Sequence, residues 1–263
     1  MLKFCSLYSG SSGNSLLVQS ANTNVLVDAG VSGKKIVEAL DSFSIDVSSI
    51  SAILVTHEHI DHVRSLGTLS KKYDIPVFAN EETWSAMPKE KAKILEKNQI
   101  LFSIDEPFSI GDLEFLAFST PHDAANSCGF NIFNSNTKIS IATDLGHVTP
   151  EIMKSLEHSK FVLLESNYDP EVLRCSSYPY PLKARIDGPN GHLSNYFAGE
   201  VLSNLMDSGL QAAMLGHLSK ENNFPELAYK TVVEQLEKHH IKESSINLSV
   251  ASRFEPSNFV EVS

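Results

Sequence analysis

The feature that most constrains this chain is a run of four metal-ligand side chains placed directly after an apolar, strand-like segment. Residues 53–55 are apolar (Ile-Leu-Val), and residues 56–62 that follow them have the sequence Thr-His-Glu-His-Ile-Asp-His. Imidazole nitrogens and carboxylate oxygens are the ligands that suit zinc, manganese and iron. On a turn that leaves a rigid strand, these four groups can point into one cavity. We therefore predict a metal site at this strand end, in preference to a solvated polar loop.

The composition is that of an ordinary globular chain and excludes a disordered or fibrous one. The chain has 263 residues, of which 42% are hydrophobic and 20% charged, which is enough for a sizeable core. Lys and Arg number 21 against 32 Asp and Glu, which gives a formal net charge of −11. This acidic balance argues against a broadly basic nucleic-acid binder, although it leaves room for a local basic patch.

Three further observations predict a cytoplasmic protein. No apolar run reaches the roughly 18 residues of a membrane span, so we expect no membrane partner. The first residues, Met-Leu-Lys-Phe-Cys-Ser, lack the basic region and apolar stretch of a signal peptide. The cysteines, Cys5, Cys128 and Cys175, are odd in number and far apart, as expected of reduced thiols. The sequence leaves the oligomeric state open.

The order of strand-like and helix-like segments predicts an α/β fold. Apolar runs bounded by turn residues predict several strands between residues 99 and 142, and others at residues 16–20, 25–27, 53–55, 76–78, 161–164, 213–215 and 246–250. Apolar periodicity predicts helices at residues 33–43, 65–73, 81–96 (broken near Pro88), 194–208 and 225–239. We expect one domain over residues 1–263, with two mixed sheets packed face to face and helices outside.

The histidine-rich segment and four further residues resemble the metallo-β-lactamase superfamily of binuclear metallohydrolases. Members of that superfamily have, in order, an Asp at an early strand end, HxHxDH, a lone His, a bridging Asp and a last His. The chain is similar, with Asp28 in LVDAG, His122 in TPHD, Asp144 in ATDLG and His217 in LGHLS. Each follows an apolar run, so each is expected at a strand end, where loops converge on a site. The resemblance spans nearly the whole chain and implies the αββα sandwich of that superfamily.

The resemblance also implies two adjacent divalent ions, zinc or manganese, with iron as a further option. The implied ligands are His57, His59 and His122 for the first ion, Asp61, His62 and His217 for the second, and Asp144 bridging both. Two ions about 4 Å apart can hold a hydroxide between them near neutral pH. Asp61 and His192 are the residues predicted to be catalytic. Asp28 is implied to orient a ligand histidine. Glu58 is expected to point away, and Glu165 at most to support Asp144.

A second histidine motif, Gly-His-Leu-Ser at residues 191–194, precedes a predicted helix and suggests phosphodiester chemistry. It resembles the tRNA-processing and phosphodiesterase branches of the superfamily, in which such a His lies beside the scissile phosphate. This resemblance implies that His192 donates a proton to the leaving oxygen and that the amides at the helix start, around Ser194, bind phosphate. The alternative is a helix-capping loop that contains a bystander histidine.

Two segments bear on the substrate. The loop at residues 9–15 (Ser-Gly-Ser-Ser-Gly-Asn-Ser) would let backbone amides approach an anion near Asn14, but its residues by themselves favour a flexible hairpin loop. Residues 178–186 interleave Lys183 and Arg185 with tyrosines, which suits a nucleic-acid strand; a rigid Pro-rich loop with solvated cations is an equal alternative. Both segments are similar to the YycJ-type (WalJ) branch of Gram-positive bacteria, whose members are regarded as 5′ to 3′ DNA exonucleases.

These observations together predict a two-metal phosphodiesterase, and the resemblance implies a 5′ to 3′ exonuclease with DNA as its substrate. The residues by themselves leave the cleavage polarity open. The 73 positions from Asp144 to His217 (217 minus 144) are expected to hold one strand, one loop and one helix. That leaves no room for the inserted nucleic-acid domain of some related ribonucleases, which argues against large structured RNA. The alternatives are a hydrolase of a small or cyclic phosphodiester, thioester or lactone, and a metal-binding partner protein without turnover.

Overall fold

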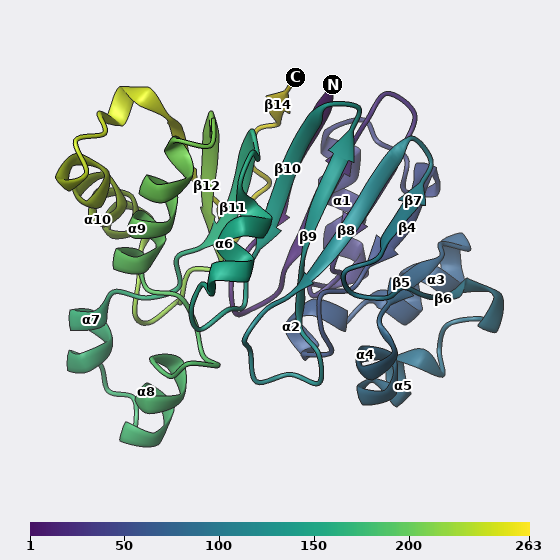
Figure 1. Ribbon diagram of the computed structural model, residues 1–263. Coiled ribbons are helices and arrows are strands. Elements are labelled where there is room, and N and C mark those ends of the chain that lie inside the picture. The colour runs from purple at the N-terminus through teal and green to yellow at the C-terminus, as the bar shows by residue number, and fades with distance from the viewer.

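Two seven-stranded sheets packed face to face form the centre of the computed structural model, which describes residues 1–263 (Figure 1). In spatial order, the first sheet consists of β14 (Val260–Val262), β1 (Leu2–Tyr8), β2 (Ser15–Gln19), β3 (Asn24–Val27), β4 (Ile50–Leu54), β5 (Val77–Ala79) and β6 (Gln99–Leu101). The second sheet consists of β13 (Asn247–Val250), β12 (Ala212–Gly216), β11 (Phe161–Glu165), β10 (Thr137–Ala142), β9 (Cys128–Asn134), β8 (Leu113–Ser119) and β7 (Pro107–Ile110). Both sheets mix parallel and antiparallel pairs, as predicted.

Helices accompany each sheet on its outer side (Figure 1). The first sheet is accompanied by α1 (Gly33–Ser42), α2 (Ile60–Val63), α3 (Leu66–Tyr73), α4 (Glu81–Ala86) and α5 (Pro88–Lys91). The second sheet is accompanied by α6 (Pro150–Leu156), α9 (Asn195–Met206) and α10 (Pro225–Lys238). Two short helices, α7 (Pro170–Cys175) and α8 (Tyr180–Ile186), extend below the second sheet in the view of Figure 1. Single turns of 3-10 helix occupy Val47–Ser49, Glu96–Asn98 and Glu243–Ser245.

The alternation of side chains along the strands sorts the apolar residues into three core layers. Phe4 of β1 and Phe161 of β11 point between the sheets, where their ring centroids lie 4.7 Å apart. Leu17 of β2 points the other way and packs in the layer beneath α1. Val162 of β11 likewise packs with Leu202 of α9. The order helix, sheet, sheet, helix confirms the predicted αββα sandwich.

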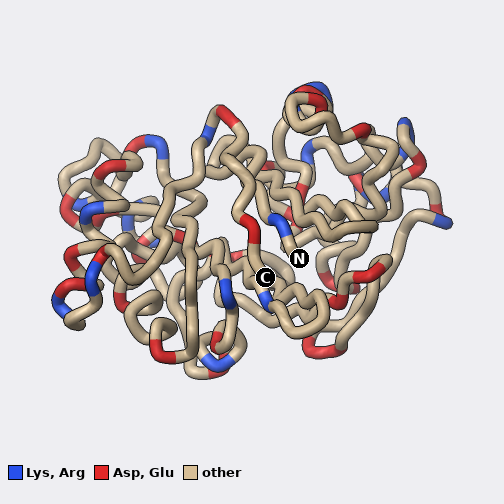
Figure 2. The backbone as a smooth tube through the Cα atoms, turned by 90° about the horizontal axis from the view of Figure 1, so that it is seen from above, with Lys and Arg blue, Asp and Glu red and all other residues tan.

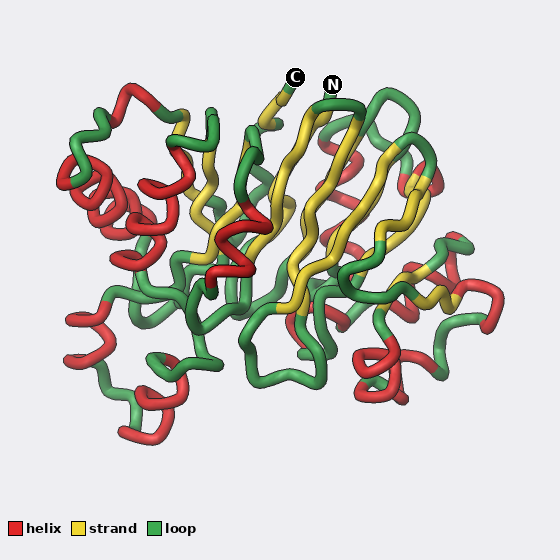
Figure 3. The backbone as a smooth tube through the Cα atoms, viewed as in Figure 1, coloured by secondary structure: helices red, strands yellow, loops and turns green.

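The carboxyl ends of β4, β8, β10, β11 and β12 open on one edge of the sandwich, the lower edge in Figure 3, where each strand continues into a loop. Strands β10, β11 and β12 run parallel to one another, so their last residues lie side by side. Parallel pairing brings loops that are distant in the sequence to the same end of a sheet. The residues predicted to bind metal follow these strand ends.

The interval from Asp144 to His217 holds more structure than predicted. One strand, one loop and one helix were expected there, but the interval contains two strands, β11 and β12, and four helices, α6 to α9. Three prolines in this interval begin helices. Pro150, Pro170 and Pro181 stand in the first turns of α6, α7 and α8, where the missing N–H costs no hydrogen bond. The segment that includes α8 is therefore helical rather than a rigid loop.

Strand β14, which the sequence analysis missed because it is only three residues long, returns the C-terminus to the N-terminus. It pairs antiparallel with β1, and Lys3 Nζ lies 2.6 Å from Glu261 Oε1. Figure 2 shows the two ends close together, with Lys and Arg positions interspersed among Asp and Glu positions along the chain. None of the helices has both the length and the apolar character needed to cross a membrane.

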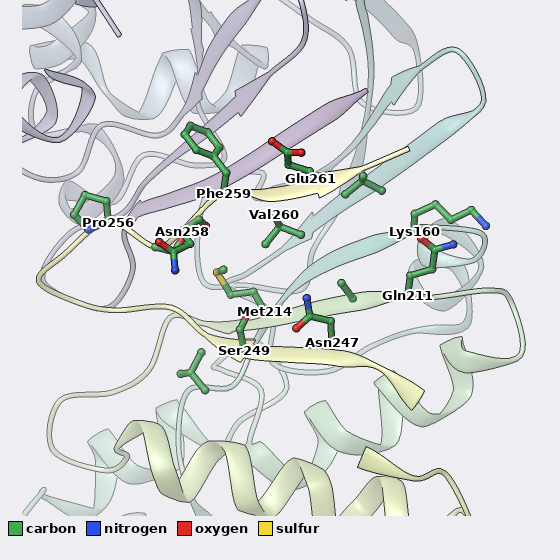
Figure 4. A pocket seen from close by; sticks show the side chains of 14 residues that line it. Lys160, Gln211, Met214, Asn247, Ser249, Pro256, Asn258, Phe259, Val260 and Glu261 are labelled. Carbon is green, nitrogen blue, oxygen red and sulfur yellow. Dashed lines mark hydrogen bonds between the residues drawn. The ribbon is translucent and has the colours of Figure 1, made fainter. Parts of the chain in front are cut away.

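A cavity of about 700 Å³ lies between β14 and the first residues of β12 and β13 (Figure 4). Lys160, Asn247 and Glu261 are among its lining residues. Because β11, β12 and β13 are parallel, their first residues lie at the opposite edge of the sandwich from their carboxyl ends. The cavity is lined by no histidine and by a single carboxylate, so the predicted metal chemistry does not belong to it.

Candidate metal centre

The first group of ligands comes from the turn after β4 and from the loop after β8. One ring nitrogen of each of His57, His59 and His122 lies within 4.8 Å of those of the other two. The ring centroids of His57 and His59 are 4.6 Å apart, and that of His122 is 5.1 Å from each. Glu58 points away, as expected, and accepts a hydrogen bond of 2.8 Å from the backbone of Ala125. Three imidazoles at this spacing can coordinate one divalent ion.

Asp61, His62 and His217 form a second group, whose ligand atoms also lie within 4.8 Å of one another. Asp61 Oδ2 is 3.7 Å from His62 Nε2 and 3.8 Å from His217 Nε2. Asp144 lies between the two groups, with Oδ2 3.4 Å from His62 Nε2 and Oδ1 3.8 Å from His122 Nε2. The structure therefore gathers all seven predicted ligands into one cluster, with a carboxylate between its halves.

Three ligand atoms of this cluster are buried without a hydrogen-bond partner: His57 Nε2, His217 Nε2 and Asp144 Oδ2. A buried polar atom that is left unpaired costs about 1–3 kcal/mol. Coordination to divalent ions would satisfy all three atoms. The residues present therefore fit two metal ions, one bound through three imidazoles and the other through two imidazoles and a carboxylate.

Burial and neighbouring carboxylates give the histidines of the cluster different protonation states. Burial lowers the pKa of His57 well below its usual value, and the nearby imidazole of His62 adds to the effect. Burial also opposes charge on His62, but the carboxylates of Asp28 and Asp144 outweigh it and raise its pKa to about 9. The same balance, burial against the carboxylate of Asp144, raises the pKa of His217 well above its usual value. The metal-free cluster therefore carries its protons in the second group.

Zinc binding by the chelator-stripped protein is expected to release protons near neutral pH. His62 is protonated below a pH of about 9 and must lose that proton before it can coordinate an ion. The apparent zinc affinity should therefore increase as the pH rises toward 9. Calorimetric titration in two buffers of different ionisation enthalpy counts the protons released, and His239→Ala, which removes an exposed histidine outside the cluster, should release the same number. Zinc uptake without proton release would contradict this charge assignment.

Asp28 follows β3 and lies behind His62. Its carboxylate accepts hydrogen bonds from the backbone N–H and the hydroxyl of Thr56, both at 2.9 Å, and from His62 Nδ1 at 2.7 Å. These contacts turn His62 Nε2 toward the cluster, which is the placement expected of a residue that orients a ligand. Asp28, Asp144 and His217 have φ values of 64°, 57° and 55°. This left-handed backbone is uncommon for residues other than glycine and concentrates at functional sites.

A buried carboxylate to which the sequence analysis gave only a supporting role holds two histidines in place. Glu165, the last residue of β11, is fully buried, and its Oε1 accepts hydrogen bonds from Nδ1 of His192 and Nδ1 of His217, both at 2.8 Å. Its Oε2 accepts the backbone N–H of Leu145 at 2.9 Å, so it also steadies the segment after Asp144. The signal that could have found it is a carboxylate ending the apolar run Phe-Val-Leu-Leu-Glu.

His192 lies beside both groups of ligands. Its ring centroid is 5.2 Å from that of His122 and 5.3 Å from that of His217. The side chain is 20% exposed, whereas the side chains of those two neighbours are almost wholly buried. Because Glu165 engages Nδ1, Nε2 is the ring nitrogen left to meet a substrate.

The loop between β1 and β2 is held against the ligands, so the interpretation as a flexible hairpin loop was incomplete. The backbone N–H of Asn14 donates to the carbonyl of Asp61 at 2.8 Å, and Asn14 Nδ2 lies 3.0 Å from His62 Nε2. At the other end of the loop, Ser9 Oγ accepts the backbone N–H of His217 at 2.8 Å. The loop therefore contacts every member of the second group.

Arg253, which the sequence analysis did not single out, braces this loop. Its guanidinium donates to Ser12 Oγ at 3.3 Å and to the carbonyl of Leu218. Gly10 makes room for it: the backbone there has a φ of 144°, and a Cβ would lie 2.9 Å from Arg253 Cζ. The arginine thus ties the C-terminal segment to the loop and to the residue after His217.

Three further residues were predicted to contact the substrate: Ser194, Lys183 and Arg185. Ser194 is buried and caps α9 by accepting the backbone N–H of Phe197 at 3.4 Å. Lys183 donates to two backbone carbonyls near the end of α7 at 2.7 Å. Arg185 donates to the carboxylate of Asp123, the residue after His122. Of the two predicted cations, Arg185 therefore lies against the loop that carries a ligand, whereas Lys183 lies beside α7.

Comparison with known proteins agrees with this geometry. The family model described as "Beta-lactamase superfamily domain" matches residues 23–218. The chain is 38% identical to exodeoxyribonuclease YycJ of Bacillus anthracis, over 90% of this chain and 89% of that protein. It is also 38% identical to exodeoxyribonuclease WalJ of Streptococcus pneumoniae, over 89% and 88% of the two chains. The solved metallo-β-lactamase fold protein YhfI from Bacillus subtilis shares the fold, with a TM-score of 0.71, 14% identity and coverage of 97% and 98%. The chain belongs to the metallo-β-lactamase superfamily.

Proposed function

We propose that this protein is a metal-dependent exodeoxyribonuclease that degrades DNA from the 5′ end. The observation that carries the proposal is the cluster of seven metal-ligand side chains, in which Asp144 lies between two groups of three. Three of the ligand atoms are buried and have no hydrogen-bond partner. The relatives named exodeoxyribonucleases match the chain over nearly its whole length and support DNA as the substrate. A single domain over residues 1–263 and a location in the cytoplasm belong to the same proposal.

Two divalent ions, zinc or manganese, would be bound by the two groups of ligands, and Asp144 would contact both. His57, His59 and His122 would hold the first ion, and Asp61, His62 and His217 the second. Bound there, the ions would activate a water molecule and neutralise charge on the phosphate oxygens. Asp28 and the loop that contains Asn14 would keep the second group in place before a metal arrives.

His192 would act as the general acid. Hydrolysis adds water across a P–O bond, so phosphorus gains a hydroxyl group and the leaving oxygen gains a proton. Nε2 of His192 would supply that proton. Glu165, which engages Nδ1, would stabilise the charged imidazolium from which the proton comes. The same contact would fix the ring so that Nε2 faces the substrate.

We place the substrate at the edge of the sandwich that carries the cluster. Asn14 lies beside His62, and Arg185 lies beside the loop of His122. Both side chains would therefore be close to a substrate phosphate bound at the metal centre. Ser194 caps α9, where the amides of Asn195 and Phe197 already donate to Tyr168 and to Ser194, so the amide of Tyr196 is the one in the first turn that would meet an anion. Lys183 would add a cation. Because the net charge is −11, electrostatic attraction alone would not bind long duplex DNA tightly. This acidic charge favours recognition of a strand end.

The proposal is tested by degradation of DNA that carries a label at either the 5′ or the 3′ end. Chelator-stripped protein would be supplied with zinc or with manganese, and His59→Ala would serve as the control for contaminating nuclease. Metal-dependent shortening from the 5′ end that is absent in the variant is the expected result. If DNA stays intact while bis-(p-nitrophenyl) phosphate is cleaved, the substrate is a small phosphodiester. Full metal content without any turnover would exclude an enzyme.

A further inference from the structure

A second cavity, of about 670 Å³, lies between α7 and α8. These two helices extend beyond the sheet at the edge where the ligands lie (Figure 1). Tyr168, Tyr178 and Tyr180 line the cavity, together with Lys183 and Asp187. Neither the metal ligands nor His192 contribute to its lining, and Lys183 is the one lining residue that the proposal above uses.

One aromatic wall of the cavity is open to solvent and is carried by a restricted stretch of backbone. Tyr180 is 82% exposed, which is more than any other large apolar or aromatic side chain in the protein. It begins α8 between Pro179 and Pro181, whose rings restrict the backbone on both sides. Tyr178 is half-buried and packs beneath the helix. A flat ligand could therefore stack on Tyr180 without any prior rearrangement of the backbone.

The polar groups of the cavity are fixed by internal hydrogen bonds. The hydroxyl of Tyr168 donates to the carboxylate of Asp187, and burial together with that carboxylate raises the pKa of the tyrosine. Lys183 Nζ donates to the carbonyls of Arg174 and Ser176, both at 2.7 Å, which ties α8 to the end of α7. Glu171 and Arg174, which pair with each other, also line the cavity, so it combines aromatic faces with two carboxylates and two cationic groups. A nucleobase has the matching chemistry, since it offers a π face and an edge of donors and acceptors.

The backbone links this cavity directly to the proposed general acid. The carbonyl of Ile186, the residue before Asp187, accepts the backbone N–H of His192 at 2.9 Å. On the other wall, the carbonyl of Tyr168 accepts the backbone N–H of Asn195 at 2.9 Å. Both walls of the cavity are therefore joined by hydrogen bonds to residues 192–195, the segment that carries His192.

We infer that the cavity between α7 and α8 binds one unpaired base of the DNA strand whose phosphate lies at the metal centre. This inference rests on the proposed function. A base in a duplex has both faces covered by its neighbours, so only a single-stranded or frayed end can place a base against Tyr180. The substrate class is then DNA with an unpaired end. Lys183 forms part of the wall of the cavity that binds the base.

The test compares Tyr180→Ala with Tyr180→Phe on a labelled single-stranded oligonucleotide. Loss of one stacking face is expected to raise KM about tenfold or more, with a much smaller change in kcat, and phenylalanine should restore the lost affinity. Ala184→Trp, which fills the cavity from α8, should raise KM in the same way. Tyr229→Ala serves as the control, because that tyrosine contacts Glu243 and does not line the cavity.

Oligonucleotides with one abasic position show whether a base occupies the cavity. One abasic position near the end should raise KM for the wild-type protein but cause little further increase in Tyr180→Ala, because both changes remove the same contact. Equal KM values for the wild type, Tyr180→Ala and Ala184→Trp would overturn the inference. A wild-type protein that degrades no DNA at all would instead overturn the proposed function, so the two failures are distinguishable.

Discussion

Replacing His59 with alanine is expected to abolish DNA degradation and to lower the metal content of the protein. The side chain supplies one of three imidazoles of the first group, and the two imidazoles that remain, with Asp144, would hold a divalent ion less tightly. Loss of that ion removes several kcal/mol of charge stabilisation in the transition state, which corresponds to a decrease in rate of about a thousandfold or more.

The fold should survive this change. His59 stands at the N-cap of α2, but its side chain makes no capping hydrogen bond, so its removal leaves the backbone contacts intact. The measurement combines elemental analysis of bound metal with the initial rate of DNA shortening and a thermal melt. His239→Ala is the matched control, because that histidine is exposed and pairs only with Glu200. Two ions per chain and normal turnover in His59→Ala would remove His59 from the ligand set.

Replacing His192 with alanine is expected to lower the rate of DNA cleavage by about a hundredfold or more and to leave the metal content unchanged. His192 is not needed to complete either group of ligands, but it lies beside both and retains a free Nε2. The departing oxygen of DNA is an alkoxide and needs a proton. A p-nitrophenolate leaves without one, so bis-(p-nitrophenyl) phosphate should lose much less rate in the same variant.

The comparison of the two substrates separates the possible roles of His192. A large loss on DNA with a small loss on the p-nitrophenyl ester identifies a proton donor. Equal losses on both substrates would instead assign His192 a positioning role. Loss of metal in His192→Ala would identify His192 as a metal ligand. Asp144, Glu165 and His217 lie close enough to His192 to bind the same ion. Glu165→Gln adds a further test, because an amide cannot stabilise the imidazolium and should reproduce part of the same substrate dependence.

The fold class could be predicted because its signals are local. Alternation along strands such as β2 and periodicity along α1 depend on residues close together in the sequence. The shortest elements could not be predicted in this way. Strand β14 exists because β1 offers it a partner, and α7 and α8 begin at prolines that also suit a loop. Tertiary contacts decide between such alternatives when a segment is too short to show a period.

The sequence by itself determined which residue types could bind metal and the order in which they occur, because each candidate ligand follows an apolar run that ends at a turn. Only the tertiary structure decided which other residues form hydrogen bonds to these ligands and hold them in place. Glu165 pairs in register with Gly216 across β11 and β12, which places its carboxylate beside His217, the next residue. The contact of Ser9 with His217 and the cavity between α7 and α8 arise in the same way. Such contacts depend on strand order, register and helix placement, which are set by packing across the whole chain and leave no periodic trace in the sequence.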